Sequence, residues 1–333
     1  MGFVALNFFA ITLLRGQNVN YNHKDFTKAD SVASLYPNHS LSDLRNLSYK
    51  LTHPFATDVD KFRAIYRWVC DNIENDYDFY KKNKYKREKL KNRPAELTEW
   101  NQKFSPRVFQ KLLEQHKTVC TGYAYLVKEL ATYAGIPCEI INGYGRTIAA
   151  NIGGSGIANH SWNAVELNNQ WYLCDATWSS GSINAQEAIF IRQFSDAYFL
   201  AASSLFVKNH YPLDTTWILL KQKPSLQEFL NGPIIYINAL SYQVTPIFPK
   251  QFNINASKGD TIHFRFQKEG DKLKESMELE IIHAVSTSSM YPAINEESQG
   301  LYNIDYVFTR RGTFVVHLLL NTEYLFTYTV NVK

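Results

Sequence analysis

The sequence predicts an α+β protein in which helices pack on an antiparallel sheet and a β-sandwich follows. Three observations support this class. Apolar residues recur at helical spacing in several segments before about residue 135. Two strand-like segments follow, at 162–167 and 171–176. From about residue 232, short alternating segments separated by turn residues replace the helical pattern. We therefore divide the chain into a leader at 1–17, a first domain at 18–232 and a second domain at 233–333.

Three helices are expected before residue 116. Leucines on one face predict the first at 40–51. Thr57 is the expected N-cap of the second, because Asp60 follows it three residues later. The pair Ser105-Pro106 has the N-cap and first-turn signature of a third helix, which would run to about residue 115.

Cys120 begins the next helical pattern. After it, apolar residues recur at helical spacing until Gly135 and Pro137 end the pattern. We expect Cys120 at or near a helix N-terminus, where the macrodipole and free backbone N–H groups favour a thiolate.

A histidine and an aspartate follow in the two strand-like segments. His160 directly precedes the first, and Asp175 lies in the second. Two adjacent strands can present both side chains to one helix end. A thiol, an imidazole and a carboxylate are the parts of a cysteine nucleophile. The sequence thus predicts that Cys120 attacks, His160 takes its proton and Asp175 orients the His160 ring.

Four blocks around these residues carry a family resemblance. They read CTGYA at 120–124, GIPCEIINGYGR, HSWNAVELNNQWYLCDATW and YFLAASSLFVKNHYPLDTTWILL. In this order they resemble the transglutaminase-like superfamily of papain-like cysteine enzymes, and most of all its kyphoscoliosis-peptidase type branch. The resemblance covers roughly residues 40 to 230.

The resemblance implies a fold, a site and an activity. The fold is a papain-like transglutaminase core, and by position the family's triad falls on Cys120, His160 and Asp175. The implied activity is cysteine-dependent acyl transfer on protein or peptide amides, with hydrolysis favoured over crosslinking. The family usually has glycine two residues before the nucleophile. Here that residue is Thr118, which would narrow access to the thiol or change the entry turn.

Other residues near the triad are candidates for the cleft wall, namely Trp162, Trp178, Thr118 and Tyr123. Trp178 is also a candidate for screening the triad from water, because it lies three residues beyond Asp175. His116 and His210 are alternative bases, for which we favour a structural or surface role. A non-catalytic secreted binding or scaffold protein with the same fold is the alternative function.

Composition limits the partners and cofactors. The chain has 333 residues, 45% of them hydrophobic and 20% charged, with a net charge of +4. This small charge predicts no nucleic-acid surface. Neither zinc-type nor calcium-type ligand spacing is present, so we expect no metal and no cofactor.

The N-terminal residues contain an apolar run of about a dozen residues, too short for a transmembrane helix. We interpret 1–17 as a secretory signal peptide, which predicts a secreted or periplasmic protein. Its amino end carries no Lys or Arg, so the alternatives are a true start upstream of Met1 or a buried N-terminal strand or helix. Cys70, Cys138 and Cys174 are expected in the core; a Cys138–Cys174 bridge is the less favoured reading.

Two further segments have open interpretations. The basic run at 81–93 is a solvated helix or insertion loop beside the active site, or a docking patch for an acidic partner, a polysaccharide or a membrane surface; we favour the former. The Gly-rich segment at 151–159 is a loop lining the cleft or a plain hairpin connection.

The last hundred residues predict an immunoglobulin-like β-sandwich. Its seven expected strands lie at 234–240, 252–256, 261–267, 277–283, 303–308, 313–320 and 324–332. We expect this domain to support the catalytic domain or to dock a protein partner.

Overall fold

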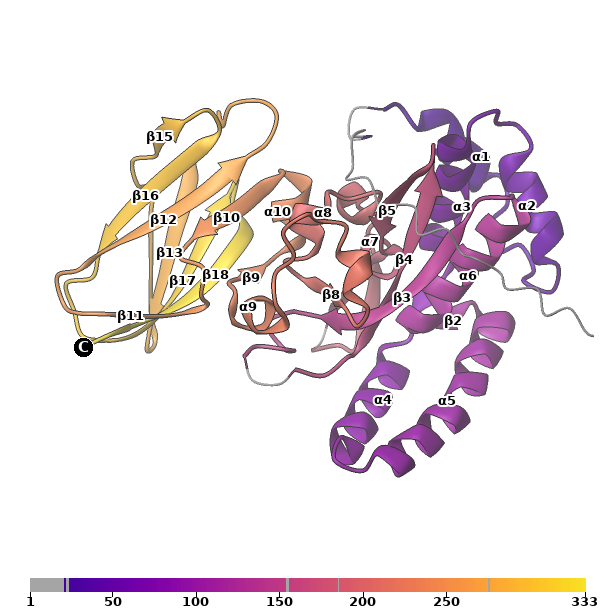
Figure 1. Cartoon of the computed structure of the whole chain (residues 1–333), viewed down its shortest axis with the longest axis horizontal. Coiled ribbons are helices and arrows are strands. Elements are labelled where there is room, and N and C mark those ends of the chain that lie inside the picture. Colours follow the sequence, from indigo (N-terminus) through magenta and orange to yellow (C-terminus); the bar gives the residue numbers. More distant parts are fainter. Residues whose placement is uncertain (1–20, 22–23, 154–155, 185, 275) are drawn as a thin grey trace, which may run out of the picture.

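The computed structural model describes residue 21 and residues 24–153, 156–184, 186–274 and 276–333. A helical layer and its sheet lie at one end of the molecule, and a β-sandwich lies at the other (Figure 1). The predicted α+β class is confirmed. The predicted leader at 1–17 lies outside the described residues. In the part that is described, no helix is both long and apolar enough to cross a membrane.

The first part is built on a four-stranded antiparallel sheet in the order β5-β4-β3-β8. Its strands are β3 (Cys138–Gly145), β4 (His160–Leu167), β5 (Gln170–Cys174) and β8 (His210–Pro212). The central helix α6 (Cys120–Tyr133) packs on β3 and β4. Around it lie α1 (Thr27–Ser34), α2 (Leu44–Thr52) and α3 (Asp58–Asn72). Thr57 caps α3 as predicted, because its side chain accepts a hydrogen bond from the Asp60 N–H.

Two helices form a hairpin that projects from this core (Figure 1). They are α4 (Tyr77–Leu90) and α5 (Pro94–Gln115), and they are framed by the parallel pair β1 (Glu74–Asn75) and β2 (Lys117–Thr118). The predicted helix start at Ser105-Pro106 is wrong, since Pro106 lies inside α5. Ser105 Oγ donates to the Asn101 carbonyl instead of capping a new helix. The ring of Phe104, two residues before the proline, stacks on Phe79 with centroids 4.4 Å apart and holds α5 to α4.

The opposite face of the sheet carries the chain toward the sandwich. The connection begins with α7 (Ala176–Ser179), which still packs on α3 and α6. It continues through β6 (Gly181–Asn184), β7 (Ile189–Arg192), η1 (Asp196–Tyr198), α8 (Ser203–Phe206), η2 (Thr215–Ile218) and α9 (Leu226–Asn231). One hydrophobic cluster runs from Trp162 and Phe206 on this face to Phe264 and Phe326 in the sandwich. The two parts therefore share a continuous core.

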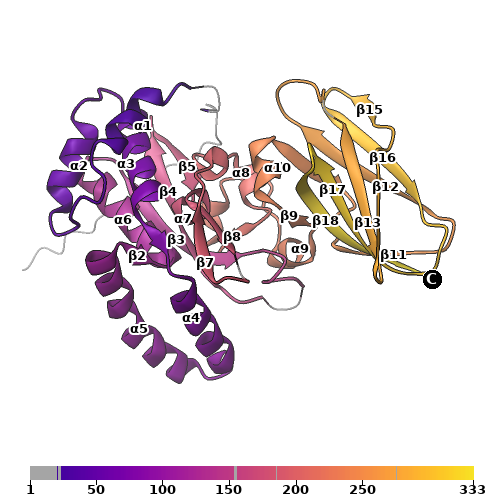
Figure 2. The ribbon, with the colours of Figure 1, turned by 180° about the vertical axis from the view of Figure 1, so that it is seen from behind.

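The C-terminal part consists of two facing sheets (Figure 2). One has the order β10-β12-β16-β15, and the other has the order β11-β18-β17-β13-β14 with β9 paired to β18. Their strands are β9 (Ile234–Ile235), β10 (Val244–Phe248), β11 (Asn253–Ala256), β12 (Thr261–Lys268), β13 (Met277–His283), β14 (Ser286–Met290), β15 (Asn295–Ser298), β16 (Leu301–Val307), β17 (Gly312–Leu320) and β18 (Glu323–Val332). All pairs are antiparallel except β11 with β18. The predicted sandwich is confirmed.

Two details of the predicted sandwich differ from the structure. The expected strand at 234–240 is only two residues long and leads into α10 (Ile237–Ser241), which buries the adjacent residues Ala239 and Leu240. A short apolar run does not distinguish a strand from a buried helix. Strands β14 and β15 were not expected, because their polar residues are almost all exposed and show no alternation.

Candidate active site

Cys120 is the first residue of α6. The backbone of the preceding residue, Val119, is extended with φ −104° and ψ 176°, so the chain enters the helix at the thiol. The first N–H groups of a helix have no acceptor within it. Cys120 therefore lies beside free donors at the positive end of the helix dipole, as the sequence predicted. Asn163 on β4 donates to the Ala124 carbonyl at 2.9 Å and holds α6 against the strand that begins with His160.

His160 and Asp175 come from neighbouring strands and are in direct contact. His160 begins β4, and Asp175 directly follows β5 as the N-cap of α7. The His160 Nε2 atom lies 2.7 Å from Asp175 Oδ2. The other carboxylate oxygen accepts hydrogen bonds from the Thr177 and Trp178 N–H groups, at 2.8 and 3.3 Å. The thiol of Cys120 hydrogen-bonds the His160 ring, for which Nδ1 is the remaining nitrogen. The structure thus brings all three predicted catalytic residues together.

A second imidazole contacts the same carboxylate. His210, the first residue of β8, places Nε2 3.0 Å from Asp175 Oδ2, and its Nδ1 lies 2.7 Å from Asn209 Oδ1. Asn209 in turn hydrogen-bonds the Tyr198 hydroxyl at 2.9 Å. His210 is fully buried and stacks on Phe206 with centroids 4.1 Å apart. His210 is thus buried next to the triad, in keeping with the structural role favoured for it. His116, the other alternative base, is the C-cap residue of α5.

The charges of these groups set their protonation. Burial alone lowers the pKa of His160, but the charges of Asp175 and Cys120 raise it to about 10. Burial raises the pKa of the Cys120 thiol, and the charge and hydrogen bond of His160 outweigh this effect, so that this pKa lies below its ordinary value. Burial raises the pKa of Asp175, and both imidazoles lower it further than burial raises it. The site favours a thiolate beside an imidazolium.

His210 stays neutral in this environment. Burial lowers its pKa to about 4, although Asp175 opposes the shift. A neutral imidazole has one N–H group. The Asp175 carboxylate only accepts, so His210 donates this hydrogen from Nε2. The Nδ1 atom is then an acceptor, which requires the flipped orientation of the Asn209 amide, with its NH2 group toward the ring.

His160, Asp175 and His210 are also the one group of described residues whose side chains could hold a metal ion, with ligand atoms within 4.8 Å of one another. Both Nε2 atoms already share Asp175 Oδ2 as a hydrogen-bond acceptor. The carboxylate is thus the hydrogen-bond partner of both imidazole rings, and the arrangement supports acid–base chemistry better than metal binding. The predicted absence of a metal stays a prediction.

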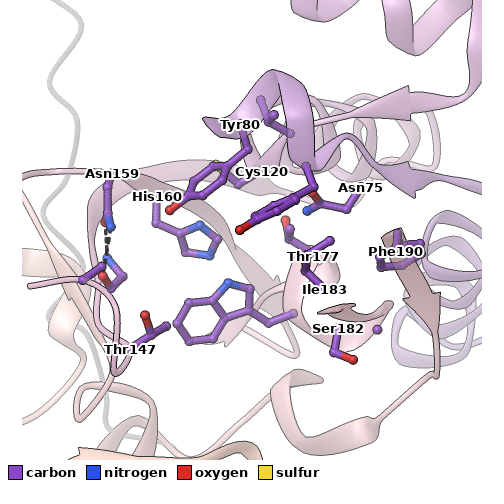
Figure 3. Close-up of a pocket in the computed structure, with 16 residues that line it drawn as sticks. Asn75, Tyr80, Cys120, Thr147, Asn159, His160, Thr177, Ser182, Ile183 and Phe190 are labelled. Atoms are coloured by element: carbon purple, nitrogen blue, oxygen red, sulfur yellow. Dashed lines mark hydrogen bonds between the residues drawn. The ribbon is translucent and has the colours of Figure 1, made fainter. Parts of the chain in front are cut away.

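Two cavities meet at the thiol, with volumes of about 280 and 410 Å³. Figure 3 shows the first, in which Tyr80 from α4 lies beside Cys120 and His160, and Ser182 and Phe190 lie on the far side. Trp178 also lines this cavity and stacks on the His160 ring with centroids 4.9 Å apart. It covers one face of the imidazole, in keeping with its predicted screening role.

The other three cleft-wall candidates line neither cavity. Thr118 is fully buried and packs over Gly122, where an added Cβ would lie 1.9 Å from the threonine Oγ1. Thr118 therefore does not narrow access to the thiol. Tyr123 is buried and donates to the Ile73 carbonyl. Trp162 is buried beneath His210, with ring centroids 5.1 Å apart.

The predicted loop before His160 both connects β3 to β4 and lines the second cavity, through Asn151, Ile157, Ala158 and Asn159. Asn159 accepts from the Gly145 N–H at 2.7 Å (Figure 3). A Cβ on Gly145 would lie 2.9 Å from the His160 Cβ, so this close approach requires glycine.

All four cysteines are free, which excludes the less favoured Cys138–Cys174 bridge in this structure. Cys70, Cys138 and Cys174 are buried as expected, and Cys120 is partly exposed.

Comparison with known proteins supports the same assignment. A family model described as the transglutaminase-like superfamily matches residues 45–176. Kyphoscoliosis peptidase from Mus musculus is 33% identical over 209 residues, which are 62% of this chain and 28% of the relative. The Homo sapiens protein of that name is 32% identical over 218 residues, or 65% and 30% of the two chains.

Hillarin from Drosophila melanogaster is more distant, at 26% identity over 224 residues, which cover 63% of this chain and 25% of the relative. The chain spans less than a third of the length of these relatives. Sequence, fold and comparisons agree at the level of the family. Residues 45–176 are therefore a transglutaminase-like domain, and the chain is similar to proteins of the kyphoscoliosis-peptidase type.

Proposed function

We propose that this protein carries out cysteine-dependent acyl transfer on protein or peptide amides through Cys120, His160 and Asp175. The observation that supports it most is the continuous contact from a helix-terminal thiol through a buried imidazole to a buried carboxylate. Transglutaminase-like domains typically carry cysteine-based acyl transfer, which is consistent with this geometry.

In the proposed reaction the Cys120 thiolate attacks the amide carbonyl carbon, and the carbonyl oxygen becomes an oxyanion. As the C–N bond breaks, the His160 imidazolium gives its proton to the leaving amine, which leaves a thioester on Cys120. Water then attacks the thioester while His160 accepts its proton. The C–S bond breaks, a carboxylic acid forms and the thiolate returns. Asp175 keeps the ring oriented through both steps.

The oxyanion needs donors near the thiol. The Cys120 backbone N–H is one, because it lies in the first turn of α6. Asn75, in β1 directly beside β2, lines the same cavity as Cys120, and we assign its side-chain amide as the second donor (Figure 3).

Hydrolysis is the favoured outcome, because the two relatives at 32 and 33% identity are named kyphoscoliosis peptidase. Transfer of the acyl group from Cys120 to an amine is the alternative outcome. The two cavities leave room on both sides of the thiol, for the two halves of a cleaved peptide or for a donor and an acceptor.

The first test is the pH dependence of iodoacetamide labelling at Cys120, read by mass spectrometry, in the wild type and in His160→Ala. An ordinary thiol with a pKa near 8.5 is almost fully protonated at pH 6. We expect fast labelling at pH 6 that collapses in the variant. Slow labelling in both proteins would contradict the proposal and favour a binding or scaffold role.

The second test measures turnover. The protein is incubated with a mixture of unfolded proteins and a labelled primary amine, and Cys120→Ala is the control. New amino termini that the control lacks indicate hydrolysis, and incorporated amine indicates transfer. If a protein with a reactive thiol yields neither product, the result argues against turnover.

A further inference from the structure

The two cavities at Cys120 differ in chemical character. They share a wall made by Tyr80, Val119, Cys120, Ala150, Asn159 and His160. Beyond that wall the first cavity has aromatic sides, including Trp178 and Phe190. The second is lined by Lys84 and Arg87 from α4, within the basic run that the sequence analysis singled out.

Arg87 is held in place, and its charge is not neutralised by a neighbouring acid. Its Nη2 donates to the Ala158 carbonyl at 2.8 Å, in the loop before His160, and its Nη1 donates to Asn101 Oδ1 at 3.2 Å. Burial lowers its pKa, whereas the negative charge of the Cys120 thiolate acts in the opposite direction. Its guanidinium has five N–H donors, and these two bonds leave three of them.

Lys84 strengthens the positive charge of this cavity. Its ammonium donates to the Ala149 carbonyl at 3.3 Å on the opposite wall. Among the residues that the structure describes, no carboxylate lies within ion-pair distance of Lys84 or Arg87. Glu88 lies at the rim of the same cavity but is exposed, so water and salt screen its charge.

We propose that the second cavity is a subsite for an acidic side chain of the substrate, next to the amide that Cys120 attacks. This inference rests on the proposed function. A partly buried guanidinium with unused donors gains most from a carboxylate, which accepts two parallel hydrogen bonds from it. The substrate class is therefore a protein or peptide with Asp or Glu close to the reacting amide.

The test compares an anionic and a neutral alkylating reagent of similar size. Rates of Cys120 labelling by iodoacetate and iodoacetamide are measured at low salt in the wild type, Arg87→Gln, Arg87→Lys and Lys89→Gln. Lys89→Gln is the matched control, because it removes the same charge from an exposed position of the same helix.

We expect the iodoacetate-to-iodoacetamide ratio to fall about two- to fivefold in Arg87→Gln, the range of one ion pair at a partly exposed site. It should stay near the wild-type value in Lys89→Gln and recover only in part in Arg87→Lys, which keeps the charge but not the two parallel donors. An unchanged ratio in Arg87→Gln, or an equal fall in the control, would overturn the subsite.

A second measurement uses peptides that carry a chloroacetyl group next to Glu, Gln or Lys. The wild type should react fastest with the Glu peptide, and Arg87→Gln should react equally with Glu and Gln. The same comparison at pH 9, where an ordinary thiol also ionises, tests the subsite even if labelling at pH 6 is slow. Slow labelling at pH 6 thus contradicts the proposed function, and a wild type that shows no preference for the Glu peptide at either pH contradicts the subsite.

Discussion

Replacing Asp175 by asparagine tests the contribution of the orienting carboxylate, because the other groups of the site stay unchanged. Asparagine keeps the size of the side chain, but it presents an amide that cannot both cap α7 and accept from His160 Nε2 as the carboxylate does. Hydrogen bonds to charged groups contribute about 1.5–3 kcal/mol, and one pKa unit corresponds to about 1.4 kcal/mol. The His160 imidazolium, which stabilises the Cys120 thiolate, should therefore lose about one to two pKa units of stabilisation.

The sign of the effect on Cys120 depends on two opposing contributions. Asp175 repels the thiolate directly, but the stabilisation by His160 is larger. His160 stays protonated at pH 6 in the variant, because a pKa one to two units below about 10 is still above 6. We therefore expect the acid limb of Cys120 labelling in Asp175→Asn to stay in place or move to slightly lower pH. The basic limb, at which His160 loses its proton, should move down by about one to two pH units.

Iodoacetamide labelling read by mass spectrometry from pH 4 to pH 10 measures this limb. Labelling at pH 10 is the internal control, because the thiol is ionised in both proteins there. A basic limb that stays in place would refute the coupling between Asp175 and His160. Thermal unfolding of both proteins checks that the variant is folded.

Three further predictions test other parts of the structure. Asn75→Ala should lower the rate of acyl transfer about 10²- to 10³-fold while iodoacetamide labelling keeps its pH profile, and a turnover rate near wild type would remove this residue from the oxyanion site. Because the pKa of His210 is about 4 when folded and near 6.5 when unfolded, the unfolded chain binds more protons between these values, so stability should fall as pH falls through this window. The free energy of unfolding, measured in urea, should fall less toward acid pH in His210→Gln than in the wild type. An identical pH dependence in both proteins would contradict a buried neutral ring. Gly122→Ala should destabilise the fold by about 1–3 kcal/mol through its clash with Thr118, and adding Thr118→Gly should recover part of that loss; additive costs in urea unfolding would contradict direct contact.

The sequence predicted the fold well where periodicity and burial agree. Helix α6 and strand β13 lie where expected, because their apolar faces are packed against the core. Pro106 misled the prediction, since a local turn signal was outweighed by the apolar stripe that packs α5 on α4. The exposed strand β15 has no buried face, so no sequence pattern marks it, and only pairing with β16 makes it a strand.

The site shows the same division between local and long-range information. Cys120, His160 and Asp175 each lie in a local pattern that indicates helix end or strand. His210 is separated from Asp175 by 35 positions and reaches it only because β8 pairs with β3 at the sheet edge. Arg87 is likewise one basic residue among many in its run, and only the fold of the α4–α5 hairpin against the loop before His160 directs it to the cavity. The residues that sequence alone assigns are those proposed to perform the chemistry. His210, which contacts Asp175, and Arg87, which is proposed to select the substrate, depend on contacts that no local pattern encodes. Variants at these two residues therefore test the fold as well as the function.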